Sequence, residues 1–377
     1  MKDIHPIKWF QRSSVRLGLA TRIVVASLLT FLLCHALALQ QSQWAILTAI
    51  IVMQSSVGAS LKATFDRFAG SIGGALWGVC VLLVVAHDTP QAMGLALTIT
   101  LVPLALLAAF KPFYRIAPIT AVILLLTPTL QGSDPRWTGL DRIFEVGVGS
   151  IVAMVVALVV FPVRAHETLA GVVSRTLGLL ADLSDQLSRS MSDHGDPKAV
   201  MELHHEIRQA ITQAESIAEE ASRERRSYLV NAPDPQPVCR TLRRLRNDLT
   251  MIGRAMDRSF AAPSVAPLAQ AAERAAVAIA TYLRQGAQAL ANREKAPSMV
   301  EVSQMLATHA AAMAQARQAG TTRNLPDELV GRIFGLAFSF EQLSENLKDL
   351  AARIDEYGGH APNAQKDLNV ASDMRVA

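Results

Sequence analysis

Ionisable side chains stand within or beside the apolar stretches of the first 165 residues. Arg67 follows Asp66 just before a glycine-rich apolar block. Arg22 and Glu145 lie inside two other blocks. A guanidinium offers a planar fork of donors that matches a carboxylate, and a carboxylate held away from water binds a proton more readily than one in solution. These residue types therefore suggest anion binding and proton exchange.

The same residues have purely structural interpretations. Arg22 and Arg67 could be interface anchors, whose long side chains reach the lipid headgroups. Asp66 has a functional interpretation as well, because it could form a gate ion pair with Arg67. His35, at the far end of the first apolar block, is a third titratable candidate, but it fits an interfacial polar residue better.

Several other chemistries find no support in the sequence. A phosphate loop of the GxxxxGK[ST] kind does not occur, so ATP hydrolysis is not expected. Cys34, Cys80 and Cys239 are scattered and suggest neither a disulfide framework nor a metal site. His204 and His205 are adjacent, so on a helix they point in different directions, unlike the two-histidine helix of zinc enzymes. We expect no metal, no cofactor and no enzymatic activity.

The apolar stretches predict a bundle of membrane-spanning helices. A helix needs about 20 apolar residues to cross a bilayer. Six stretches qualify, separated by short connections such as LKATFDR and QGSDPRWTGLD: 17–39, 43–60, 68–87, 91–110, 116–132 and 142–162. The fold class is therefore all-α, with an N-terminal tail at 1–15 and a six-helix transmembrane domain at 16–164.

The charges predict the orientation of this domain. Residues 1–164 hold 12 Lys/Arg and 6 Asp/Glu, while residues 165–377 hold 24 and 26. Ten of the twelve basic residues fall on the side of the two termini, and Arg136 and Arg142 fall on the other. The positive-inside rule then places both termini in the cytoplasm. Since the second half is nearly neutral, nucleic acid is not an expected partner.

Two local patterns indicate how the spans are built. Gly70, Gly74 and Gly78 lie on one helix face and would allow a neighbouring helix to approach closely. Spans two and five are interrupted, the first at 54–58 and the second by prolines 118 and 128. If the spans form two inverted groups of three, these are corresponding positions, where transporters place their binding sites.

Residues 165–357 predict about six helices with breaks near 194–197, 231–237, 261–267, 296–298 and 320–326. Two apolar seams repeat at steps of three and four, at 238–260 and 329–354, and predict a helical bundle. The seams could instead be dimer contacts. The basic run at 239–249 could meet anionic lipid or be a solvated face. Residues 358–377 are predicted to be a disordered tail.

Two segments resemble the fusaric acid resistance/aromatic acid exporter family. Residues 141–162 resemble the last span of its membrane unit, with an Arg, paired glycines and a terminal Phe-Pro. The signature of 44–78 is matched by Trp44, Ala45, Thr48, Gln54, Gly58, Arg67, Gly70 and Gly74. The resemblance covers about residues 15–165.

This resemblance implies an exporter of aromatic or related organic acids in a bacterial inner membrane, driven by the proton gradient. Arg67 is then the first candidate cation for the acid group and Arg22 the second. The substrate-binding candidates are Arg67, Gln54, Thr48, Trp44 and Arg22; the coupling or gating candidates are Glu145 and Asp66. Trp44 could stack on a ring or sit in an interfacial belt.

The resemblance also bears on partners. Many exporters of this kind carry two membrane units in one chain, whereas this chain has one, which implies a homo-oligomer. It further implies a periplasmic adaptor and an outer-membrane channel as possible partners. Two other functions stay open: a passive organic-anion channel, and a non-transporting scaffold or sensor whose helical domain binds a partner.

Overall fold

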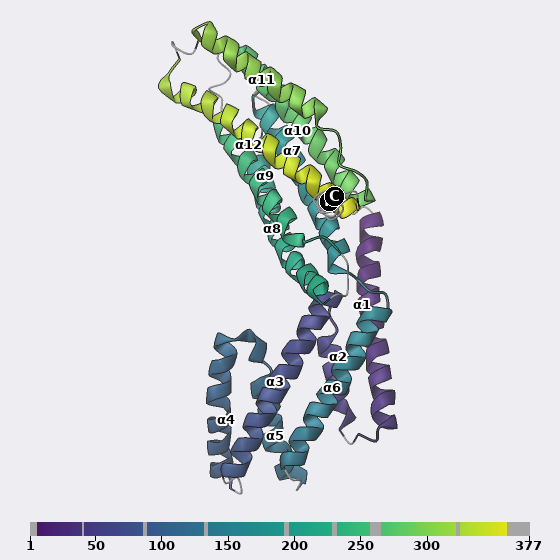
Figure 1. Cartoon of the computed structure of the whole chain (residues 1–377). Coiled ribbons are helices and arrows are strands. Elements are labelled where there is room, and N and C mark those ends of the chain that lie inside the picture. Colours follow the sequence, from purple (N-terminus) through teal and green to yellow (C-terminus); the bar gives the residue numbers. More distant parts are fainter. Residues whose placement is uncertain are drawn as a thin grey trace, which may run out of the picture. The chain divides into compact units, whose positions relative to one another are not determined.

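The computed structural model describes residues 6–39, 41–85, 89–131, 135–191, 196–227, 232–256, 265–321 and 325–359 (Figure 1). The regular structure in these residues is entirely helical, as the all-α prediction requires. The chain divides into two compact units, residues 1–165 and 166–377. Each unit is described by itself below.

Unit 1 contains six α-helices and one short 3₁₀ helix within its described residues. They are α1 (Pro6–Ala36), α2 (Ser42–Val52), α3 (Val57–Val84), α4 (Pro90–Phe110), η1 (Pro112–Tyr114), α5 (Ala117–Gln131) and α6 (Pro135–Val159). Helices α3 and α6 pack against each other at the centre (Figure 1). Helix α2 packs on α6 and α5 packs on α3, while α1 and α4 flank these pairs.

Within the described residues, four segments of unit 1 are long and apolar enough to cross a membrane. They are Leu17–Ala36, Val57–Val84, Pro90–Phe110 and Trp137–Val159, so the chain is a multi-pass membrane protein. The predicted spans two and five correspond to shorter apolar helices, Ser42–Val52 and Pro112–Leu126. Helix α2 has 11 residues. Its length is therefore about 16 Å, roughly half of the hydrocarbon core.

Two predicted connections are wrong. Residues 61–67 were expected to be a turn, but they lie inside α3. Ser56 caps this helix by accepting a hydrogen bond from the Ala59 amide, and nothing in 57–67 breaks a helix. Residues 135–141 belong to α6, which begins at Pro135, a residue suited to the first position of a helix. Charged residues marked the ends of apolar runs, but they did not end the helices.

The predicted interruption after α2 is present. The chain leaves the helix at Met53, whose backbone is extended, and α3 starts at Val57. The Gln54 amide donates to Ser60 Oγ at 2.9 Å, and Arg22 Nη2 donates to the Ser55 carbonyl at 3.1 Å. Side chains of the protein therefore already bond two of the backbone polar groups at this break.

The glycine stripe of α3 packs against α5. A Cβ added to Gly70 would lie 3.0 Å from Ile116 Cβ, and one added to Gly74 would overlap the Ala117 carbonyl. Gly78 faces Leu124 and Ala121 in the same way. These contacts agree with the packing role expected of the glycines, because a side chain at Gly74 would meet the backbone of α5.

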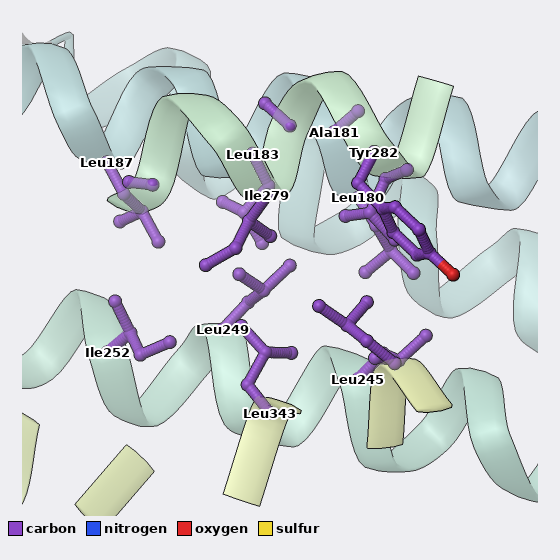
Figure 2. Close-up of a cluster of buried hydrophobic side chains, with 14 of the residues drawn as sticks. Leu180, Ala181, Leu183, Leu187, Leu245, Leu249, Ile252, Ile279, Tyr282 and Leu343 are labelled. Carbon is purple, nitrogen blue, oxygen red and sulfur yellow. The ribbon is translucent and has the colours of Figure 1, made fainter. Parts of the chain in front are cut away.

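Unit 2 contains six helices within its described residues, which begin and end close to the predicted breaks. They are α7 (Ala165–Met191), α8 (Pro197–Arg226), α9 (Pro235–Ala255), α10 (Ala266–Asn292), α11 (Val300–Gln318) and α12 (Asp327–Gly358). Figure 2 shows part of their shared core, where Leu183 of α7 and Ile279 of α10 lie next to Leu249 of α9, and Leu180 of α7 lies next to Tyr282 of α10.

The two predicted seams lie in this core. On α9, Val238, Leu242, Leu245, Leu249 and Ile252 are buried. On α12, the whole seam from Leu329 to Ile354 is buried. The seams therefore form intramolecular core, which is the favoured of the two alternatives. The last residue of the α9 seam, Phe260, and the predicted tail from residue 360 onward lie outside the described residues.

Candidate functional site

A cavity of about 240 Å³ lies in unit 1, beside the connection between α1 and α2. Its volume equals that of about eight waters at ~30 Å³ each. Helices α5 and α6 contribute most of its wall. The lining residues are Ala38, Leu39, Gln41, Ile123, Leu124, Thr138, Asp141, Arg142 and Glu145.

Arg142 is the central cation of this cavity. Its Nη1 lies 3.5 Å from Glu145 Oε2, and both side chains are about 5% exposed. Its Cζ lies 3.6 Å from the centre of the Trp44 ring, a cation–π contact. Trp44 is held in turn by its indole N–H, which donates to Gln41 Oε1 at 3.2 Å. The guanidinium is therefore clamped between an aromatic face and a carboxylate.

Arg67 is buried next to this arrangement. Its Nη2 donates to Thr48 Oγ1 at 3.3 Å, which joins α3 to α2. It lies about 15 Å along the helix axis from Val57, at 1.5 Å per residue. Arg67 therefore lies inside a long helix, with 8% of its surface exposed, and not in a turn between two helices.

The two arginines are close enough to interact electrostatically. Among the described side chains, Arg67 Nε and Arg142 Nη1 are buried without a hydrogen-bond partner. The separation of 3.5 Å between Arg142 and Glu145 is longer than a direct hydrogen bond. The buried donors are therefore under-satisfied, and an anionic ligand could complete them.

The structure brings together only some of the predicted site residues. Thr48, Trp44, Arg67 and Glu145 are joined through the contacts above. Arg22 is fully buried elsewhere, bonded to the carbonyls of Gly18 and Ser55. Gln54 has an exposed side chain that donates to the Ile51 carbonyl.

Two further candidates lie outside the cluster. Asp66 is half-buried, one position before Arg67 on α3. His35 is exposed on α1 and stacks on Phe31. The charge pair that the structure places at the cavity is Arg142 with Glu145.

Arg142 is the functional candidate that sequence reasoning missed. It was counted only as a basic residue of the side opposite the termini, at the first position of the predicted last span. A signal was nevertheless present, because Arg142 and Glu145 are three residues apart and such residues are neighbours on a helix. Recognising it required placing the start of α6 at Pro135.

In unit 2, the basic run on α9 divides between two environments. Arg243 pairs with Glu215, and Arg244 Nη1 lies 3.9 Å from Asp349. Arg246 instead lines a groove with Arg208 and Arg254. The paired half of the run fits the solvated-face interpretation.

The two adjacent histidines also diverge. His204 lines the same groove, where burial and nearby arginines lower its pKa. His205 is exposed and bonds Gln209. Within the described ranges, no group of three or more His, Cys, Asp or Glu side chains could hold a metal ion.

These features define a multi-pass α-helical membrane protein with buried arginines beside a cavity. Comparison with known families is more specific. Residues 26–156 match the model of the family described as fusaric acid resistance protein-like. The match confirms the resemblance carried by residues 44–78 and 141–162.

A curated relative is similar over part of the chain. A UPF0421 protein of Staphylococcus saprophyticus subsp. saprophyticus is 25% identical over 187 residues, which are 48% of this chain and 54% of the relative. The match thus spans about half the length of the curated relative.

Proposed function

We propose that this protein exports aromatic or related organic acids across a bacterial inner membrane. The observation that carries the proposal is the pair of buried arginines, Arg67 and Arg142, the second of which lines a cavity in a largely apolar bundle. Ionisable residues inside membrane segments are costly and usually serve a transport pathway. The fusaric-acid-resistance-like match supports an organic acid as the substrate class.

The cavity walls fit such a substrate. A carboxylate at Arg142 would take the buried donors that now lack partners. Ile123, Leu124 and Leu39 would cover a hydrocarbon portion, and Gln41 and Thr138 would accept or donate hydrogen bonds. The volume is below the ~300–1,000 Å³ of typical ligand pockets, which favours a small organic acid.

Glu145 would act as a competitor of the substrate. While it is ionised, it pairs with Arg142. A substrate carboxylate must displace it, and a protonated Glu145 leaves the guanidinium free. Ionisation of Glu145 would then expel the substrate, so we assign this residue the gating role.

The driving force would be the proton-motive force. An organic anion that leaves a negatively charged cytoplasm gains about 2.3 kcal/mol per 100 mV of membrane potential. The charge asymmetry still supports cytoplasmic termini: once the buried Arg22, Arg67 and Arg142 are set aside, eight basic residues remain on the terminal side and one on the other. We further propose a homo-oligomer, with a periplasmic adaptor and an outer-membrane channel as candidate partners.

Efflux from cells tests the proposal. Cells that express the protein would be loaded with a radiolabelled aromatic carboxylate, and retention would be measured with and without a protonophore. We expect protonophore-sensitive efflux that is lost in Arg67→Ala and in Arg142→Ala at equal membrane expression. Thr98→Ala on α4, whose hydroxyl bonds its own helix, is the matched control and should leave efflux unchanged.

The alternative functions predict other results. A passive channel would give flux that survives the change Glu145→Gln, because no gating carboxylate is needed. A scaffold or sensor would show no efflux, and its cellular role would be lost on deletion of residues 166–377 but not on replacement of either arginine. If well-expressing cells retained every acid tested, the proposal of an exporter would be overturned.

A further inference from the structure

Unit 1 contains two copies of one sequence pattern, which no comparison above assigns. The segment WAILTA at 44–49 corresponds to IAPITA at 116–121, and DRFAGSIGG at 66–74 corresponds to DRIFEVGVG at 141–149. The alignment pairs Thr48 with Thr120 and Arg67 with Arg142. The two buried arginines are therefore equivalent residues of a repeat.

The packing of the helices repeats in the same way as the sequence. If α1, α2 and α3 are exchanged with α4, α5 and α6, the contacts are preserved: α2 on α6 becomes α5 on α3, and α1 against α2 becomes α4 against α5. The two short helices, α2 and α5, occupy equivalent positions in the two copies. The start of α3 meets the chain just after α6, where the Val57 amide donates to the Val163 carbonyl at 3.2 Å, so α3 and α6 run antiparallel and the two copies are inverted.

Two close contacts repeat at the level of single atoms. A Cβ on Gly74 would overlap the carbonyl of Ala117, at 3.0 Å from its Cα. A Cβ on Gly149 would overlap the carbonyl of Ala45, at 3.0 Å from its carbonyl carbon. Gly149 is the repeat equivalent of Gly74, and Ala45 is the equivalent of Ala117. The correspondence thus holds in sequence, topology and contact.

The two halves nevertheless differ around their arginines. At Arg142 the structure has a cavity, with Glu145 and Trp44 beside the guanidinium. At Arg67 the equivalents of those residues are Gly70 and Ile116, and they pack directly together, with Ile116 Cβ 3.0 Å from the position of a Gly70 Cβ. The surroundings of Arg142 are therefore open, and the equivalent surroundings of Arg67 are closed.

From these observations we propose that the repeats exchange conformations, and that Arg67 forms a second anion-binding position that opens to the opposite side of the membrane. Its lining follows from the repeat: Ile51 for Ile123, Ala63 for Thr138 and Asp66 for Asp141. Inverted repeats that are packed differently can swap packings around a shared site. The inference rests on the proposed function for its ligand, an organic anion held in turn by Arg67 and Arg142.

Accessibility of engineered cysteines tests this position without any transported substrate. In a background with Cys34, Cys80 and Cys239 replaced by alanine, single variants Thr138→Cys and Ala63→Cys would be treated with a membrane-impermeant maleimide. The reagent would be applied to intact spheroplasts and, separately, to inside-out vesicles. Ile123→Cys and Ile51→Cys form a second pair, in case one of the first variants does not fold. Val102→Cys, an exposed position in the middle of α4 that lipid would cover, is the control that should react from neither side.

We expect Thr138→Cys to react from one side and Ala63→Cys from the other. In the double variant, modification of the first position with a bulky reagent should lower labelling of the second several-fold, because only one end opens at a time. Labelling of both positions from the same side would overturn the inference. The inference would also be overturned if, in the double variant, modification of the first position left labelling of the second undiminished, because that result indicates a continuous pore.

The two proposals fail in different ways. Alternating labelling without efflux of any organic acid would leave the second position standing and refute the substrate class. Efflux that depends on Arg67, combined with one-sided labelling of both cysteines, would refute the second position alone.

Discussion

At the scale of single residues, the environment of Arg142 decides what unit 1 can bind. The guanidinium lies over Trp44 and beside Glu145, and one of its buried nitrogens lacks a hydrogen-bond partner. Burying a cation in an apolar bundle is costly unless it is paired. A carboxylate ligand and Glu145 therefore compete for the same donor.

This competition predicts opposite effects of Glu145→Gln on binding and on turnover. The neutral amide cannot displace an anion from Arg142, so affinity for an aromatic carboxylate should rise while efflux falls. Equilibrium binding to the purified protein in detergent, together with cell efflux, measures both. Unchanged binding with unchanged efflux would show that Glu145 has no gating role.

Unit 2 carries a buried histidine whose titration affects stability. Burial lowers the pKa of His309 to about 4, and its ring packs edge-on to Phe340 at 5.0 Å. The unfolded chain takes up the proton near pH 6.5, but the folded chain does not. Stability is thus lost as pH falls from about 6.5 to 4, by about 2 kcal/mol at pH 5 and about 3 kcal/mol at pH 4.

We expect His309→Leu to remove most of this acid sensitivity. Thermal unfolding of the full chain in detergent, followed by far-UV circular dichroism at pH 7 and pH 5, would show a smaller drop in melting temperature than for the wild type. His205→Leu, at an exposed position of α8, is the matched control and should keep the wild-type drop. Equal drops in all three proteins would contradict the burial argument.

At the scale of elements, two glycine contacts fix the distances between helices. Gly74 brings α3 onto α5, and Gly149 brings α6 onto α2. Overpacking such a contact by one methyl group costs about 1–3 kcal/mol. Because the backbone of the partner helix is the obstacle, it cannot rotate away as a side chain could.

Gly74→Ala and Gly149→Ala should therefore lower the melting temperature in detergent to a similar extent. Gly94→Ala, where a Cβ meets nothing within 4 Å, should leave it unchanged or raise it slightly. A destabilisation by only one of the first two variants would argue against their equivalence. Loss of stability in all three would point to a general effect of replacing glycine.

The sequence predicted the helices well and the site partly. The seams of α9 and α12 have the period of a helix packed on a core, so both could be recognised without coordinates. The bounds of α3 and α6 could not, because a charged residue in an apolar run resembles the end of a span. The pairing of Arg142 with Glu145 was hidden for that reason.

At the scale of the whole molecule, the single membrane unit bears on assembly. The chain has a mass of 40.6 kDa, and the described residues of unit 1 form one set of six α-helices. If transport needs two such units, the detergent-solubilised protein should have at least twice that protein mass. Light scattering coupled to size exclusion measures it, with the detergent contribution subtracted. A single-chain mass for protein that still transports would exclude the homo-oligomer.

The most direct measurement is anion flux through the purified protein in liposomes. Vesicles preloaded with a radiolabelled aromatic carboxylate would receive a potassium diffusion potential, negative inside, through valinomycin. We predict that the potential accelerates release, and that Arg67→Ala and Arg142→Ala each abolish the acceleration while Thr98→Ala keeps it. If the potential did not change the rate of release, or if the acceleration persisted in Arg67→Ala and Arg142→Ala, the claim that these buried cations carry an organic anion across the membrane would be contradicted.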